Sequence, residues 1–165
     1  MSIFCLQIVY NDTQKGGLVL LEKILQKEFI QLNVDALDWR DAIKKSAKPL
    51  LDYNKISKEY ISAMIESVEE FGPYIVLVKH VALAHAKPGN SVKELAMSAL
   101  TLNHPVNFHH ESNDPVSLVF TLAAPDSCSH LDALKKWAEV VNNEEKVQLL
   151  KQCTNVEQFK ALMVE

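Results

Sequence analysis

The stretch that organises this chain, residues 76–88, reads Val-Leu-Val-Lys-His-Val-Ala-Leu-Ala-His-Ala-Lys-Pro. The pattern predicts that an apolar strand, Tyr74–Val78, is followed by a short apolar segment with two histidines and then by a Lys-Pro-Gly turn. His85 stands between two alanines, and small neighbours leave an imidazole accessible to a large partner. Such a histidine is either structural or chemical, and the rest of the chain bears on the choice.

The composition is that of a soluble, single-domain protein. The chain has 165 residues, of which 48% are hydrophobic and 23% are charged. The net charge is −4 and no basic cluster is interleaved with aromatic residues, so we expect no nucleic-acid partner. No apolar run reaches the roughly 18 residues that a membrane helix needs. Cys5, Cys128 and Cys153 form no CxxC pair, which predicts free thiols and a cytoplasmic location.

Apolar residues at helical spacing flank a central block of strand-like segments. They predict six helices with polar residues at several starts, Asp38, Asn143 and Thr154 among them. The predicted helices are residues 18–29, 39–51, 57–71, 131–141, 144–151 and 156–163.

The central block predicts a mixed sheet. Besides Tyr74–Val78, we expect strands at residues 29–35, 106–108 and 116–124, with a turn at His104-Pro105. Residues 93–102 fit a helix or a strand, and the alternation of Leu95, Met97 and Ala99 favours the strand. The fold class is therefore α/β, with a mixed central sheet flanked by helices on both faces. Residues 1–19 are expected to be an N-terminal extension, either an edge strand or loosely held, that precedes a domain formed by residues 20–165.

Three chemistries are open to the six histidines. Metal binding is one, although neither His80 with His85 nor His109 with His110 has the i, i+4 spacing of a helical zinc site. Hydrolysis by a Ser-His-Asp set is another, but the chain has no G-x-S-x-G motif. Phosphoryl transfer on a histidine nitrogen is the third, and it needs only a neutral imidazole and hydrogen-bond donors around the phosphoryl oxygens.

Two histidines fit the phosphoryl-transfer chemistry. His85 is expected in a loop after a strand, where backbone N–H groups can surround a phosphoryl group. His130 is expected just before or within the first turn of the helix that starts near Leu131, which adds the positive end of a helix dipole. The alternative for His130 is a solvent-exposed residue at the start of that helix.

The order of these features resembles a known family. The stretches that carry the resemblance are Phe71-Gly72-Pro73-Tyr74, Val81-Ala82-Leu83-Ala84-His85-Ala86-Lys87-Pro88, and Asn113-Asp114-Pro115-Val116 followed by Leu122-Ala123-Ala124, Asp126 and His130. They are similar to the enzyme IIA component of the bacterial phosphoenolpyruvate-dependent sugar phosphotransferase system, in the mannitol/fructose fold group. The last two blocks look most like the ascorbate-type branch, and the resemblance extends from about residue 20 to the end of the chain.

The resemblance implies a cytoplasmic phosphocarrier with the phosphotransferase/anion transport protein-like fold. His85 matches the histidine that accepts the phosphoryl group as a tele-phosphohistidine from the carrier protein HPr. His130 matches the second histidine, which stabilises the phosphoryl oxygens. The group then passes to a cysteine of enzyme IIB and to a sugar, L-ascorbate or a related compound, that enters through the membrane enzyme IIC. No cofactor and no metal are implied.

Some positions depart from the family pattern. Ala84 stands where proline often precedes the acceptor histidine, and Lys79 and Glu69 stand where the mannitol branch has a glutamate and an arginine. We expect His80 to lie near His85 as an auxiliary donor to the phosphoryl group, or else to be a partly buried histidine at a strand end. A docking surface around His85 is expected to include Val81, Ala84 and Ala86. A regulatory phosphohistidine domain of the same fold is the alternative function, and a histidine-rich metal-binding protein is a more distant one.

Overall fold

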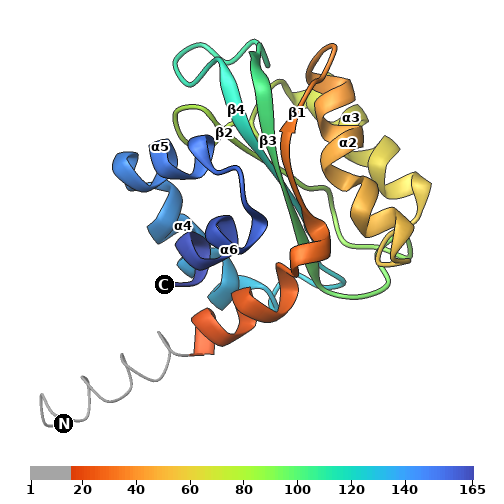
Figure 1. Ribbon diagram of the computed structural model, residues 1–165. Coiled ribbons are helices and arrows are strands. Elements are labelled where there is room, and N and C mark those ends of the chain that lie inside the picture. The colour runs from red at the N-terminus through yellow and green to blue at the C-terminus, as the bar shows by residue number, and fades with distance from the viewer. Residues whose placement is uncertain (1–15) are drawn as a thin grey trace, which may run out of the picture.

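The computed structural model describes residues 16–165. In this part of the chain, four strands form one mixed sheet and helices pack on both of its faces (Figure 1). The predicted fold class is therefore confirmed. Residues 1–15 lie outside the described part, and the first described helix, residues 16–24, spans the boundary predicted at residues 19 and 20. The division into an extension and a domain stays a prediction.

The helices divide into two layers, one on each face of the sheet (Figure 1). Two helices cover the first face, α2 (Trp39–Asp52) and α3 (Lys58–Phe71). The second face is covered by residues 16–24, α4 (Leu131–Val141), α5 (Glu144–Gln152) and α6 (Val156–Val164). No helix within residues 16–165 is long and apolar enough to cross a membrane.

The sheet combines parallel and antiparallel pairs. Its strands are β1 (Ile30–Val34), β2 (Val81–Ala84), β3 (Ala96–Val106) and β4 (Val116–Ala123). The order is β1-β3-β4-β2, with β1 parallel to β3, β3 antiparallel to β4, and β4 parallel to β2. Every residue of β2 and β4 is buried, as expected for strands covered on both faces. Because β2 and β4 are parallel, their carboxyl ends lie at the same edge of the sheet.

Side-chain alternation along β2 joins the sheet to both helical layers. Ala82 and Ala84 belong to the core cluster that includes Tyr60 of α3. Val81 and Leu83 belong to the cluster on the other face, which is built around Phe120, Trp137 and Phe159. The period of two in a strand therefore places small residues under α3 and larger ones under α4 and α6.

Polar side chains start several of the helices. Asp38 accepts a hydrogen bond from the Asp41 N–H at the start of α2, and Asn143 accepts one from the Lys146 N–H at the start of α5, as predicted. Helix α6 is capped by Asn155, which accepts from the Gln158 N–H, so the prediction of Thr154 as its cap is wrong by one residue.

The predicted strand at Tyr74–Val78 is wrong, because the strand beside β4 lies further along the chain, at Val81–Ala84. Gly72, with φ of 82°, ends α3, and turn hydrogen bonds from Tyr74 to Gly72 and from Val76 to Pro73 follow it. Residues 74–78 then run beside the outer edge of β2, where the Leu83 N–H donates to the Ile75 carbonyl. Both segments are apolar, and the turn geometry selects which one pairs with β4.

The strand prediction for residues 93–102 is confirmed, but β3 continues through the predicted turn at His104-Pro105 to Val106. A separate strand at residues 106–108 is therefore wrong. The register of β3 against β4 shifts between Thr101 and Val106, and residues 103–105 are exposed. This irregularity accommodates the proline, because Pro105 has no N–H to give to a ladder.

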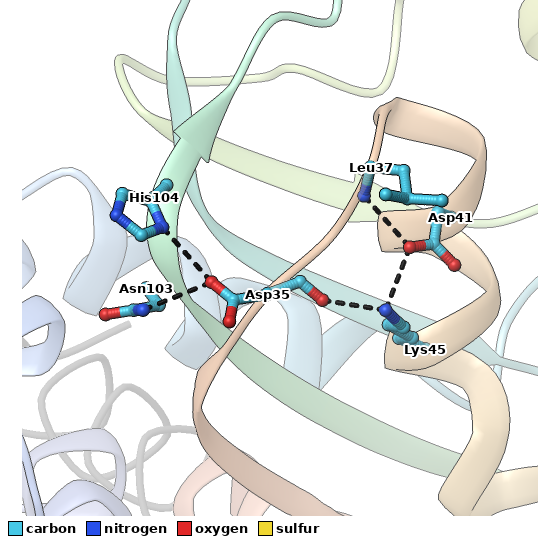
Figure 2. Close-up of polar contacts among 6 residues, drawn as sticks. All are labelled: Asp35, Leu37, Asp41, Lys45, Asn103 and His104. Atoms are coloured by element: carbon cyan, nitrogen blue, oxygen red, sulfur yellow. Dashed lines mark hydrogen bonds and ion pairs between the residues drawn. The ribbon is translucent and has the colours of Figure 1, made fainter.

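A polar cluster fastens the end of β1 to β3 and α2, as Figure 2 shows. Asp35 Oδ1 accepts from Asn103 Nδ2 and His104 Nδ1, each at 3.1 Å, while Lys45 Nζ donates to the Asp35 carbonyl at 2.8 Å. The hydrogen bonds from Asn103 and then His104 hold the pKa of Asp35 below its usual value. The cluster lies at the carboxyl end of β3, which the antiparallel pairing places at the opposite edge from the carboxyl end of β2.

The first described helix packs closely against α4 at Gly17, and a substitution there can test this packing. A Cβ added at Gly17 would lie 2.6 Å from the Asp132 backbone oxygen, closer than atoms can pack. We expect Gly17→Ala to lower the free energy of unfolding by about 1–3 kcal/mol, as overpacking does. Urea unfolding followed by tryptophan fluorescence measures the change.

Gly16 supplies the matched control. It belongs to the same helix, and a Cβ there would meet nothing within 4 Å. Because alanine favours a helix over glycine by up to about 1 kcal/mol, Gly16→Ala should be neutral or stabilising. Equal effects of the two substitutions would contradict the close packing of Gly17 on α4.

Candidate functional site

His85 and His130 reach one cavity from the carboxyl ends of two neighbouring strands. In the parallel pair of β2 and β4, Ala84 lies opposite Thr121. His85 follows β2 directly, and the segment after β4 leads to His130, the residue that precedes α4. Both histidines line an open cavity of about 720 Å³. The structure thus brings together the two histidines that the sequence analysis singled out.

The rest of the cavity wall comes from α3 and the segment after it, from the loop after β2, and from the end of β4 with the segment that follows it. Its apolar part includes Phe71, Tyr74, Pro88 and Leu122. Its polar groups include Glu70, Lys87 and Ser127. A mostly apolar cavity that contains a few polar groups is typical of a ligand-binding site.

A backbone hydrogen bond fixes the tautomer of His85. Its Nδ1 lies 2.7 Å from the carbonyl oxygen of Leu83. A carbonyl oxygen only accepts, so Nδ1 carries the proton and donates. In the neutral ring Nε2 then holds a lone pair and no proton. The imidazole is half-buried, so this nucleophilic nitrogen remains accessible.

Two tyrosines hold the peptide unit that joins His85 to Ala86. The Tyr74 hydroxyl donates to the His85 carbonyl at 3.2 Å, and the Tyr74 ring packs against the imidazole at 5.4 Å in a T-shaped arrangement. The Ala86 N–H donates to the Tyr60 hydroxyl at 3.2 Å, which itself donates to the Leu122 carbonyl at 2.6 Å. Burial raises the pKa of Tyr60 to about 12, so this hydroxyl keeps its proton at neutral pH.

The polar role of Tyr60 was not predicted from the sequence, because Tyr60 fits the apolar stripe of α3. Its side chain is 1% exposed. The hydroxyl of a buried tyrosine usually makes a hydrogen bond, so a tyrosine in a buried stripe is a signal that could have indicated a polar contact.

His130 occupies the position that precedes the first turn of α4. Its carbonyl accepts the Leu134 N–H, while its Nδ1 is buried and has no hydrogen-bond partner among residues 16–165. Of the two neutral tautomers, the one with the proton on Nε2 and a bare lone pair on Nδ1 is favoured, because a buried N–H without an acceptor is costly. His130 therefore offers an N–H donor to a group in the cavity.

The turn before His130 is organised by Asp126. Its Oδ1 accepts the N–H groups of Ser129 at 2.6 Å and Cys128 at 2.8 Å. These hydrogen bonds, with that from Ser129 the larger cause, lower the pKa of Asp126, and His130 adds a favourable charge interaction. The residue at the cap position of α4 is His130, and its side chain makes no capping hydrogen bond.

His80 lies at the opposite end of β2 from His85, so the expectation that the two lie close together is wrong. Its Nδ1 lies 2.7 Å from the Pro115 carbonyl, and its backbone has a left-handed φ of 71°. It lines a different cavity, of about 400 Å³, beside α5. Because β2 separates the two imidazoles, His80 cannot donate to a group bound at His85.

The other predicted positions also lie outside the cavity that holds His85. His104 belongs to the Asp35 cluster, and Glu69 pairs with Arg40 at 2.8 Å. His109 and His110 line a third cavity beside Tyr74. Among the described residues, no three His, Cys, Asp or Glu side chains are grouped so that they could hold a metal ion. Val81 and Ala84 are fully buried, so they cannot contribute to a docking surface.

A mixed α/β sheet with two imidazoles in one open cavity is compatible with phosphoryl transfer on a histidine nitrogen. The sequence model described as "Phosphoenolpyruvate-dependent sugar phosphotransferase system, EIIA 2" matches residues 23–165. The chain therefore belongs to the EIIA family of this phosphotransferase system.

Individual relatives agree with this membership. The ascorbate-specific PTS system EIIA component of Escherichia coli K12 is 30% identical over 135 residues, which are 81% of this chain and 88% of that protein. The mannitol-specific cryptic phosphotransferase enzyme IIA CmtB of Escherichia coli has 31% identity and a TM-score of 0.78, over 87% of this chain and 97% of that one. Enzyme IIA(Mtl) in its complex with phosphorylated IIB(Mtl) of Escherichia coli shares the fold at 22% identity, with a TM-score of 0.73, over 82% of this chain and 94% of that one.

The turn held by Asp126 is expected to weaken in acid. Because the folded-state pKa lies below the unfolded value, the carboxylate contributes stability that is fully present above about pH 4 and lost as the pH falls through the lowered pKa. The amide proton shifts of Cys128 and Ser129 should titrate together at that lowered pKa. NMR of the native protein between pH 2 and about 6 measures this.

Asp126→Asn is the matched control, since the amide keeps an acceptor oxygen without the charge. In this variant the acid titration of both amide protons should disappear. Amide shifts that titrate at the ordinary aspartate value of about 3.9, or that titrate unchanged in Asp126→Asn, would contradict the assignment.

Proposed function

We propose that this protein is the phosphocarrier EIIA of a sugar phosphotransferase system, which accepts a phosphoryl group on Nε2 of His85 from phospho-HPr and passes it to a cysteine of enzyme IIB. The observation that carries the proposal is the Nδ1–H hydrogen bond to the Leu83 carbonyl, which leaves Nε2 unprotonated in the cavity shared with His130. This is the nitrogen whose phosphorylation gives a tele-phosphohistidine.

The transfer needs no proton at the attacking nitrogen. The Nε2 lone pair of His85 forms the new N–P bond while the N–P bond of the donor phosphohistidine breaks, and the electron pair of that bond stays on the donor ring. The His85 ring gains positive charge as the bond forms. The Nδ1–H bond to the Leu83 carbonyl becomes charge-assisted, which stabilises the phosphorylated ring. Transfer to a thiolate of enzyme IIB follows the same steps in the reverse sense.

His130 is proposed to hold the phosphoryl oxygens during transfer. Its ring lines the cavity from the amino end of α4, where the helix dipole also favours negative charge. Lys87 lines the same cavity and adds a cation that the exposed loop after His85 can bring to the phosphoryl group. Glu70 of α3 also lines the cavity and gives it an anion, which favours release of the phosphoryl group to the next acceptor.

The transported sugar is proposed to be L-ascorbate or a related compound. The relatives named as ascorbate-specific support this assignment, because the match covers 81% of the chain. The solved complex of enzyme IIA(Mtl) with phosphorylated IIB(Mtl) supports enzyme IIB as a partner. The sugar itself is taken up through enzyme IIC, so EIIA acts on it only through enzyme IIB and works on the cytoplasmic side.

Phosphorylation in vitro tests the roles of the two histidines. Incubation with enzyme I, HPr and phosphoenolpyruvate should add one acid-labile phosphoryl group, seen by intact-protein mass spectrometry. His85→Ala should abolish the label because it removes the acceptor nitrogen. His130→Ala should slow the uptake by roughly 10²–10³-fold, the usual effect of losing one donor to a developing charge.

His80→Asn is the matched control, because His80 lies beyond the other end of β2 and asparagine tolerates its left-handed backbone. This variant should take up the phosphoryl group at the rate of the unchanged protein. A labelled His85→Ala protein would refute His85 as the acceptor, and an unchanged rate in His130→Ala would refute the role of His130.

The apolar rim of the cavity is proposed as the surface that both HPr and enzyme IIB use in turn. We call it the rim surface and define it as Phe71, Tyr74 and Pro88, which line the cavity, together with the exposed Leu131, which follows His130 in the sequence. Phe71 is 68% exposed and Leu131, next to His130, is 56% exposed. Large exposed apolar side chains beside a functional group are typical of a protein-docking site.

Truncation of the rim surface should weaken docking and leave the chemistry intact. Phe71→Ala is expected to raise the KM for phospho-HPr about tenfold, equivalent to about 1.4 kcal/mol, with kcat nearly unchanged. Leu149→Ala is the control, because Leu149 is a 50% exposed leucine of α5, outside the cavity. Steady-state uptake at varied phospho-HPr concentration separates the two constants, and equal KM values for both variants would exclude this surface.

A further inference from the structure

The pairing of β2 with β4 stops one residue before His85, at a point where the backbone could continue it. In a parallel pair, the N–H groups that face the neighbour belong to alternate residues. The His80 carbonyl accepts the Leu118 N–H, whereas the Leu83 N–H turns away from β4 to Ile75. The even-numbered residues of β2 therefore face β4, and Ala86 is the next of them.

The register predicts a direct hydrogen bond that the structure replaces. Ala84 lies opposite Thr121, so Ala86 would lie opposite Ala123 and its N–H would reach the Leu122 carbonyl. Instead the Ala86 N–H donates to the Tyr60 hydroxyl at 3.2 Å, and that hydroxyl donates to the Leu122 carbonyl at 2.6 Å. A side chain from α3 thus occupies the place of one bond of the ladder.

An inserted hydroxyl has a mechanical consequence. A direct N–H···O bond would hold the two backbone atoms about 2.9 Å apart, whereas a hydroxyl between them keeps the strands further apart. The strand assigned as β2 ends at Ala84, in agreement with this separation. The peptide that is held away from β4 is the one between His85 and Ala86, and the carbonyl of this peptide accepts the Tyr74 hydroxyl.

We propose that Tyr60 is a positioning residue of the phosphoryl-transfer site, whose hydroxyl separates the end of β2 from β4 and so sets the place of His85 relative to His130. The inference rests on the proposed phosphocarrier function for its kinetic part only. Tyr60 contacts both segments at once, because Ala86 follows one histidine and Leu122 lies on the strand that leads to the other. Without the hydroxyl, the ladder extends by one bond and draws His85 toward β4.

Tyr60→Phe tests the separation in the unphosphorylated protein. In the unchanged protein, NMR should detect no scalar coupling across a hydrogen bond between the Ala86 nitrogen and the Leu122 carbonyl carbon. In Tyr60→Phe this coupling should appear, and the ¹⁵N shifts of the His85 ring should report a weaker Nδ1–H bond. A coupling already present in the unchanged protein would overturn the proposal without any variant.

The rate of phosphoryl uptake from phospho-HPr provides the functional readout. We expect Tyr60→Phe to lower it by ten- to a hundred-fold, as small displacements of reacting groups do. Tyr74→Phe should lower it less and should show no Ala86–Leu122 coupling, since Tyr74 holds the same peptide without separating the strands. Tyr53→Phe is the matched control, because Tyr53 is 54% exposed and lies outside the cavity, and its rate should not change.

Urea unfolding gives the folded fraction of each variant, and each uptake rate is then expressed per folded molecule so that the rates can be compared. A Tyr60→Phe protein that takes up the phosphoryl group at the unchanged rate would overturn the proposal, as would a lower rate without the new coupling. Failure of the unchanged protein to be phosphorylated would instead contradict the proposed function, while the coupling measurement would still decide whether the hydroxyl separates the strands.

Discussion

The parallel pairing of β2 with β4 is the constraint on which the whole site depends. It places the residue after β2 and the segment after β4 at one edge of the sheet, so His85 and His130 line the same cavity although they are far apart in the sequence. The antiparallel step from β4 to β3 sends His104 to the opposite edge, and His80 lies there too because it precedes β2. The directions of the strands alone therefore place His85 and His130 at one edge of the sheet and His80 and His104 at the opposite edge.

The group that orients His85 is a backbone carbonyl, and this choice has a chemical advantage. Many functional histidines are oriented by a carboxylate, whose own protonation can change the tautomer. The Leu83 carbonyl does not titrate, so the neutral ring keeps its proton on Nδ1 at any pH at which the fold is intact. The second histidine is held differently, by a helix start and a turn that depends on the charge of Asp126.

Periodicity in the sequence located α2, α4 and α5 well, because each buries a regular apolar stripe, and α2 and α5 also begin at a side-chain cap. It failed at β2, since residues 74–78 and 81–84 are both apolar runs and only the turn after Gly72 decides which of them pairs with β4. The short sequence separation of His80 and His85 also led to the wrong expectation that the two side chains lie close together. A strand rises about 3.3 Å per residue, so the two histidines that flank β2 are roughly 16 Å apart.

The site itself was predictable to different degrees. His85 and His130 follow strands or precede a helix, and both positions are visible in the pattern of the sequence. Tyr60 was hidden because only its hydroxyl differs from the apolar residues of its stripe, and a contact between Ala86, Tyr60 and Leu122 joins three separate elements. Such a contact depends on the distance between α3 and the sheet, which no local pattern contains.

The distance between α3 and the sheet also depends on the alanines that precede His85, so these alanines do more than leave the imidazole accessible. Ala82 and Ala84 are fully buried in the cluster with Tyr60, and larger side chains there would push α3 away from the sheet. The Tyr60 hydroxyl could then no longer reach between Ala86 and Leu122. Ala84 also keeps an N–H that faces β4, which a proline at this position would lack. The ladder is thus held up to the last residue before His85 and is interrupted immediately after it.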